Sequence, residues 1–211
     1  MGYLKAGQKT FDSERVITFS DGVIAVAITL LVLDLKLPEG VSDAQLGSVL
    51  SENLHSLGVY VLSFLVVGIL WMGHHEQFSH IRRVDAVLIW INLLFLMTIG
   101  LIPFTTSLLS DHGTSLSTVL YAGVLVTTSV LSAAMWWYAA RDPALMPADV
   151  PEAVRREGFL STLLTGAVFA LSIVIALAWS ATAAQWSWLL LIPVSRVPAM
   201  LERARSNNGD N

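Results

Sequence analysis

The sequence predicts an all-α membrane protein whose single domain crosses the bilayer six times. The first observation is composition: of 211 residues, 55% are hydrophobic and only 13% are charged, with a mean hydropathy of +0.66. Soluble domains carry about 25% charged residues. The second observation is that the apolar residues fall in blocks about 20 residues long, the length that an α-helix needs to cross the hydrocarbon core. The third is that Lys and Arg gather in alternate gaps between these blocks.

Six apolar blocks are long enough to be predicted as membrane-spanning helices. The last two are separated only by SATAAQ, which predicts a tight hairpin, and Pro193 and Pro198 interrupt the final block. Residues 1–200 are therefore expected to form one transmembrane domain, and residues 201–211 a disordered cytoplasmic tail. The predicted spans are residues 14–36, 54–76, 84–109, 115–140, 157–180 and 183–200.

The basic residues predict the orientation of these helices. Of twelve Lys and Arg residues, eleven lie before the first block, after the second, after the fourth or near the end of the chain, and only Lys36 lies on the other side. Basic loops stay in the cytoplasm, so both termini are expected there. The N-terminal segment lacks the apolar core of a cleaved signal peptide.

Composition also excludes several classes of function. With no cysteines, the chain has no disulfide framework and no Cys-based metal or redox site. It has no long basic run of the kind that binds nucleic acid, and no cofactor or small-molecule substrate is evident. A Ser–His–Asp catalytic triad could be drawn from Ser20, Asp21 and His74 or His75. The serine, however, lies in the body of a helix without an oxyanion hole, and the GxSxG motif is absent. An enzyme is therefore not expected.

The first predicted helix has two distinct faces. At 100° per residue, Asp21 points about 130° away from the centre of one stripe, and Ser20 lies on a third side. The stripe and Asp21 are therefore expected to serve different purposes. The stripe consists of Arg15, Phe19, Gly22, Val26, Thr29, Leu30 and Leu33.

Asp21 is two turns inside an apolar helix, where a carboxylate is costly unless it is paired or faces water. Pairing within the bundle is the favoured interpretation, and contact with a ligand or with the helix dipole stays open. In the predicted orientation, His74, His75 and Asn92 lie in the same half of the membrane as Asp21. A structural hydrogen-bond network among these groups is expected.

The histidines have two alternative roles, as metal ligands or as a proton relay. A zinc site needs three or four ligands at suitable spacing, and His74, His75 and His80 offer neither an i, i+4 pair nor HEXXH. No metal site is therefore predicted. A titrating proton relay remains an alternative, because histidine changes its charge near physiological pH.

Four segments together resemble the bacterial members of the transmembrane protein 175 family of potassium channels. They are RVITFSDGVIAVAITLLVLDL, WMGHHEQF, RRVDAVLIWINLLFL and LIPFTTSLL, which occur in this order between Arg15 and Leu109. The RxxxFSD pattern is the family's hallmark. The later helices carry no motif that matches.

The resemblance implies a homotetramer in the plasma (inner) membrane of a bacterium, with potassium as the permeant ion and no cofactor. The first helix of each subunit would line a central pore, with Val26 at the main constriction and Thr29, Leu30 and Leu33 further along. The constriction would act as hydrophobic gate and selectivity element. Many relatives have Ile at this position, so a wider ring is expected here. The implied packing network comprises Arg15, Phe19, Ser20, Asp21, His74, His75 and Asn92.

The sequence leaves two alternatives to a potassium channel open. A proton or non-selective cation leak would use the same scaffold and differ only in selectivity. A secondary transporter would be expected to show internal repeats and broken helices. No repeat relates residues 1–110 to residues 111–211, and the first predicted helix is not broken.

Overall fold

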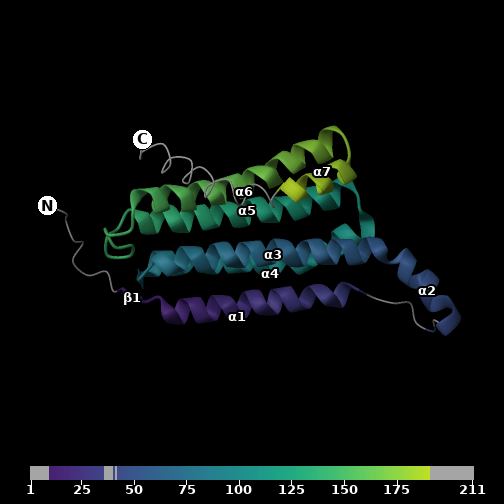
Figure 1. The fold of residues 1–211 in the computed structure, drawn as a ribbon, viewed down its shortest axis with the longest axis horizontal. Coiled ribbons are helices and arrows are strands. Elements are labelled where there is room, and N and C mark those ends of the chain that lie inside the picture. The colour runs from purple at the N-terminus through teal and green to yellow at the C-terminus, as the bar shows by residue number, and fades with distance from the viewer. Residues whose placement is uncertain (1–9, 36–39, 41, 191–211) are drawn as a thin grey trace, which may run out of the picture.

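The computed structural model describes residues 10–35, 40 and 42–190. In this part of the chain, helices dominate and run side by side along one long axis (Figure 1). Two very short strands and two 3₁₀ turns complete the described structure. In chain order the elements are β1 Phe11–Asp12, α1 Glu14–Leu30, η1 Leu31–Asp34, α2 Asp43–Glu52, α3 Leu54–His80, β2 Arg83–Val84, α4 Ala86–His112, α5 Ser115–Ala140, α6 Glu152–Ala178, α7 Ala181–Ser187 and η2 Trp188–Leu190.

Five of the described helices are long and apolar enough to cross a membrane. They are α1 with its 3₁₀ extension, α3, α4, α5 and α6, and they correspond to the first five predicted spans. The sixth predicted span, residues 183–200, begins in α7 and η2, and its part after residue 190 lies outside the described residues. The predicted tail, residues 201–211, lies outside them as well.

The long helices form three layers (Figure 1). α1 forms one outer layer, α3 and α4 the middle layer, and α5 and α6 the other outer layer, with α7 against α6 at one end. The core lies between the middle and outer layers and is filled by Phe95, Tyr121 and Trp136, which are at most 2% exposed. As a result, α1 packs on α3 and α4 along one side only.

Local signals explain where the middle helices begin and end. The Asp85 carboxylate accepts a hydrogen bond from Leu88 N at 2.8 Å and so caps the start of α4. Gly113 has a φ of 57° and ends α4 in the left-handed conformation that glycine adopts without strain. Thr114 then caps α5 by accepting from Ser117 N, so two long helices reverse direction over two residues.

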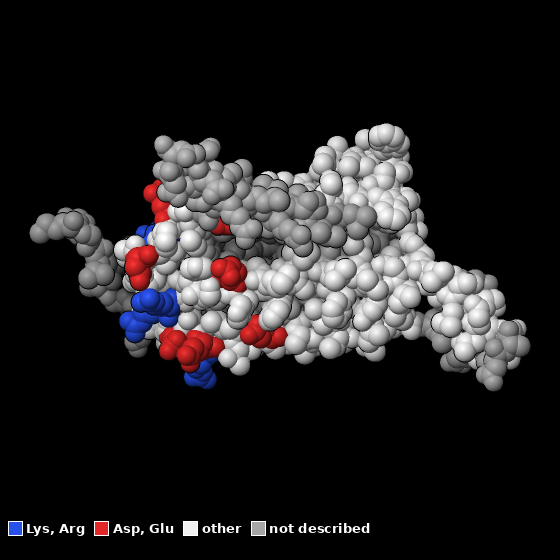
Figure 2. Space-filling view, viewed as in Figure 1, with Lys and Arg blue, Asp and Glu red and all other residues white. Residues whose placement is uncertain are grey.

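Charged side chains gather at one end of the molecule on the face shown in Figure 2. At this end β1 pairs antiparallel with β2, with Phe11 opposite Val84. The loop after α5 packs there too, because Arg82 N donates to Leu145 O at 3.0 Å. Arg155 fixes that loop by donating to the carbonyls of Ala140, Pro147 and Val150. This charged end is the one predicted to face the cytoplasm.

Two local features differ from what the sequence predicted. The fifth span was predicted to begin at residue 157, yet α6 begins at Glu152, directly after Pro151. The first helical N–H groups need no partner within the helix, so a proline is tolerated there. The second feature is α2, a helix that the sequence analysis did not predict, which projects from the bundle (Figure 1) and whose first turn is closed by a capping box of Ser42 and Gln45.

Candidate functional site

One face of α1 has no partner within the described residues. Phe19 is 55% exposed, Val26 58%, Leu30 43% and Leu33 63%. They belong to the stripe predicted from the sequence, and Arg15, Gly22 and Thr29 on the same stripe are exposed too. The opposite face is buried against α3 and α4 through Ser20, Ile24, Ala27 and Leu31, each at most 3% exposed. An apolar helix face this long is costly in water and calls for lipid or another protein surface.

The side chain of Thr29 on the exposed face is hydrogen-bonded to its own helix. Its Oγ1 donates to the carbonyl of Val26 at 2.8 Å. The hydroxyl hydrogen is therefore used within the helix, and the oxygen lone pairs remain to accept a hydrogen bond or to contact a cation. Two residues later the helix tightens into the 3₁₀ turn η1.

The buried face of α1 is joined to α4 and α3 by a chain of hydrogen bonds. Asn92 Nδ2 on α4 donates to Ser20 Oγ at 2.9 Å. Asn92 Oδ1 lies 2.9 Å from His74 Nε2 on α3, so this ring nitrogen is the donor. Ser20 in turn donates to Val16 O at 2.8 Å. Since all three side chains are at most 1% exposed, the chain of bonds fixes how α1 sits on its two neighbours.

Asp21 makes a separate contact. Its Oδ1 accepts from Trp71 Nε1 on α3 at 2.9 Å, and the side chain is only partly buried. The sequence analysis did not single out Trp71. Two signals were available. Trp71 lies three residues before His74, so both lie on neighbouring faces of α3 within reach of α1. In addition, an indole N–H that is not solvated needs a hydrogen-bond acceptor.

The other predicted network residues are placed differently. His75 is exposed, and its ring lies 5.9 Å from that of Trp71. Arg15 and Phe19 are exposed, and among the described residues no hydrogen bond or ion pair joins Arg15 to another element.

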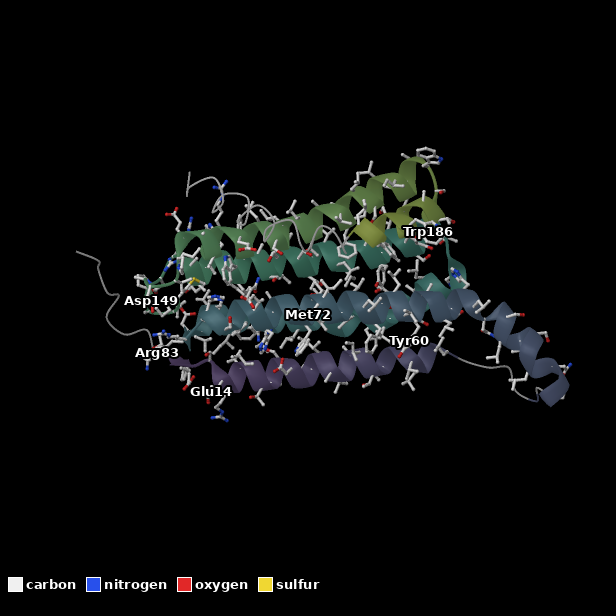
Figure 3. The ribbon with its side chains drawn as sticks, viewed as in Figure 1. Glu14, Tyr60, Met72, Arg83, Asp149 and Trp186 are labelled. Atoms are coloured by element: carbon white, nitrogen blue, oxygen red, sulfur yellow. The ribbon has the colours of Figure 1, made fainter. Side chains whose placement is uncertain are left out.

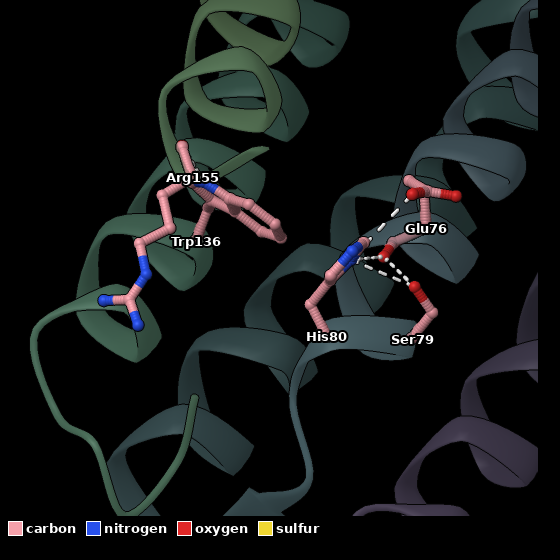
Figure 4. A network of polar contacts seen from close by, with 5 residues as sticks. All are labelled: Glu76, Ser79, His80, Trp136 and Arg155. Atoms are coloured by element: carbon pink, nitrogen blue, oxygen red, sulfur yellow. Dashed lines mark hydrogen bonds and ion pairs between the residues drawn. The ribbon is translucent and has the colours of Figure 1, made fainter. Parts of the chain in front are cut away.

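A second polar cluster lies at the charged end of α3 (Figure 4). His80 Nδ1 is 2.9 Å from Glu76 O and 3.0 Å from Ser79 Oγ, and its ring meets Trp136 edge-on at 5.9 Å. The Trp136 indole donates to Arg155 O on α6. Figure 3 shows that the charged residues Glu14, Arg83 and Asp149 lie at this same end, with Trp186 at the other. In the described part of the chain, no three His, Asp or Glu side chains come together as a metal site would require.

Comparison with known proteins identifies the family. The family model described as endosomal/lysosomal potassium channel TMEM175 matches residues 15–103, which include α1, α3 and most of α4. A potassium channel of Chamaesiphon minutus is 33% identical over 141 residues, covering 64% of this chain and 70% of the relative. The chain belongs to the TMEM175 family. The family resemblance inferred from the four sequence segments is thereby confirmed.

Two further comparisons, with a second bacterial relative and with a solved structure, agree with this TMEM175 assignment. A potassium channel of Streptomyces collinus is 40% identical over 135 residues, or 62% of this chain, and the chain spans 66% of that relative, just under two thirds. The crystal structure of a lysosomal potassium-selective channel TMEM175 homolog from Chamaesiphon minutus superposes with a TM-score of 0.75 at 25% identity, over 88% of this chain and 97% of the other. The family consists of ion channels and not of enzymes.

Proposed function

We propose that this protein is a subunit of a potassium-permeable channel in which four copies surround a pore lined by α1. The observation that carries the proposal is the exposed stripe of α1, because its residues face away from every other described helix of the chain. Four such stripes around one axis would cover this apolar surface. The relatives named potassium channels support the identity of the ion.

The narrowest part of the pore is assigned to Val26. Four Val26 side chains would form an apolar ring that blocks conduction by dewetting when tight and passes a partly dehydrated cation when slightly wider. Potassium sheds water more easily than sodium, which favours its passage. Thr29, one turn further, adds four oxygen acceptors, and Leu30 and Leu33 continue the wall.

The buried face of α1 holds this ring in register. The Ser20–Asn92–His74 chain attaches α1 to α4 and α3, and the Trp71–Asp21 bond adds a second attachment to α3. The membership of Arg15, Phe19 and His75 in this packing network stays a prediction from the sequence. The protein would lie in a bacterial plasma membrane with its charged end and both termini in the cytoplasm.

The test is electrical recording from the purified protein in liposomes with potassium inside and sodium outside. A reversal potential biased towards potassium, reduced in Val26→Ala, is the expected result. Val174→Ala is the matched control, because Val174 on α6 is 60% exposed and Val26 is 58% exposed. Equal permeability to both cations would reject potassium selectivity.

Two further outcomes would point to the alternatives. A reversal potential that follows an imposed pH gradient indicates a proton leak on the same scaffold. Saturable tracer flux without electrical current indicates a secondary transporter.

A further inference from the structure

A cavity lies at the end of the molecule opposite the charged residues. It has a volume of about 390 Å³ and is formed where the first turns of α3, the last turns of α4 and α7 meet. Small-molecule sites in proteins typically measure about 300–1,000 Å³ and are mostly apolar with a few polar groups. No described residue of the α1 stripe lines the cavity, so the stripe does not account for it.

The cavity has an apolar floor. Val59 and Leu109 are 5% and 0% exposed, and Leu62 lies beside them. The part of α3 that lines it, from Leu54 to Leu62, rises about 12 Å at the usual rise of 1.5 Å per residue. This shape suits a slender hydrocarbon chain lying along the helix.

Uncharged polar groups lie around this floor. Gln185 Nε2 donates to Thr118 Oγ1 at 3.2 Å, which fixes the amide, and no described residue donates a hydrogen bond to its Oε1. His55 and Thr182 also line the cavity. No Lys, Arg, Asp or Glu occurs among the described lining residues, so the groups match hydroxyl, ester or amide oxygens and offer no fixed charge to a phosphate.

The surroundings of the cavity are those of a membrane boundary. Trp186, at its edge, is 67% exposed and Trp179 is 87% exposed, and Figure 3 shows Trp186 at this end of the bundle. Tryptophan is enriched where the hydrocarbon core meets the headgroups. Exposed Leu57 does not line the cavity and continues the apolar surface of α3 outside it.

We propose that this cavity binds a membrane lipid, with one acyl chain along Val59 and Leu62 and the uncharged ester region at His55, Thr182 and Gln185. A second copy of the chain is a poorer fit, because protein–protein interfaces bury about 800 Å² per partner over broad surfaces, whereas this is one small hollow. The bound lipid connects α3 and α4 to α7, whose contacts with the other described helices are mainly with α6.

Gly58 provides a selective way to fill the cavity. It lines the cavity, and a Cβ built on it meets no heavy atom within 4 Å. The Cβ of a leucine there would meet no neighbour, and the rest of the side chain would occupy part of the cavity. Replacing a helical glycine also favours folding. Gly123 on α5 is the matched control, because it is also helical with nothing within 4 Å and does not line the cavity.

The experiment uses the whole protein reconstituted in phosphatidylcholine vesicles that contain a trace of phosphatidylcholine with a photoactivatable acyl chain. Labelling should concentrate on residues 54–62 and 182–186. Relative to wild type it should fall about tenfold in Gly58→Leu, equivalent to about 1.4 kcal/mol of binding free energy. It should not change in Gly123→Leu. The peptide containing Leu177, which is 70% exposed on α6, reports contact with bulk lipid.

Three results would overturn the proposal. The first is labelling of residues 54–62 no stronger than that of the Leu177 peptide. The second is equal labelling in wild type and Gly58→Leu. The third is labelling that appears only when the lipid has an anionic headgroup, because the proposed site recognises the acyl chain and the ester region of the lipid. None of these readouts depends on ion conduction, so the proposed channel function is tested separately.

Discussion

At the scale of single residues, Asn92 is the centre of the α1 attachment. Its amide donates to Ser20 and accepts from His74, so one side chain joins three helices. The sequence correctly indicated that these residues lie at a similar depth, because helix order and direction fix depth. It did not reveal that Trp71 and not a histidine would bind Asp21, because the rotation of α3 depends on packing.

Replacing Asn92 with leucine is expected to destabilise the protein by about 1–3 kcal/mol, the cost of leaving a buried polar partner unsatisfied. The His74 ring would lose its bond while remaining 1% exposed. Thermal unfolding of the purified protein in detergent measures the change. Thr127→Val is the control, because Thr127 is exposed and bonds only to Gly123 O within its own helix. Equal melting temperatures for Asn92→Leu and wild type would refute the role of Asn92.

Substitutions of Asp21 distinguish hydrogen bonding from charge. Asparagine can still accept from Trp71 Nε1, whereas leucine cannot. Asp21→Asn should therefore conduct at close to the wild-type rate, and Asp21→Leu should lose most of the flux. Potassium flux from liposomes at matched protein density measures both. If Asp21→Asn lost as much flux as Asp21→Leu, the negative charge itself would be required.

At the scale of elements, α5 and α6 pack most closely at the charged end. A Cβ built on Gly158 would lie 2.6 Å from Trp136 Cζ2. The Trp136 ring cannot easily retreat, since its indole donates to Arg155 O and its edge meets His80. Hydropathy predicted both helices but not this contact, because a glycine in an apolar run does not reveal which side chain faces it.

Gly158→Ala is expected to destabilise the protein by about 1–3 kcal/mol through overpacking. Gly123→Ala, where nothing lies within 4 Å, should instead be neutral or stabilise by up to about 1 kcal/mol. Chemical or thermal unfolding of the two variants under identical conditions measures the difference. Equal stabilities would show that the two helices do not meet at Gly158.

At the scale of the whole molecule, the described helices leave a continuous, mostly apolar face of α1 uncovered. The face was predicted from helical periodicity alone, because seven positions recur at the same angle. Its role in a pore did not follow from periodicity, since Val, Leu and Phe on a membrane helix are equally suited to lipid. That role follows from the proposed assembly of four chains.

The proposed assembly predicts a particle of four 22.9 kDa chains. Native mass spectrometry of the detergent-solubilised protein measures this directly. A monomer or dimer in conditions that preserve conduction would be incompatible with a pore made from four α1 helices.

The most direct test of the central claim uses cysteine accessibility. The chain contains no cysteine, so Val26→Cys introduces a single thiol on the α1 stripe and Val174→Cys a single thiol of similar exposure on α6. If α1 lines the pore, a water-soluble, positively charged thiol reagent should abolish the current of Val26→Cys and leave wild type and Val174→Cys unchanged. Modification of Val26→Cys, verified by mass spectrometry, without any change in current would contradict the account.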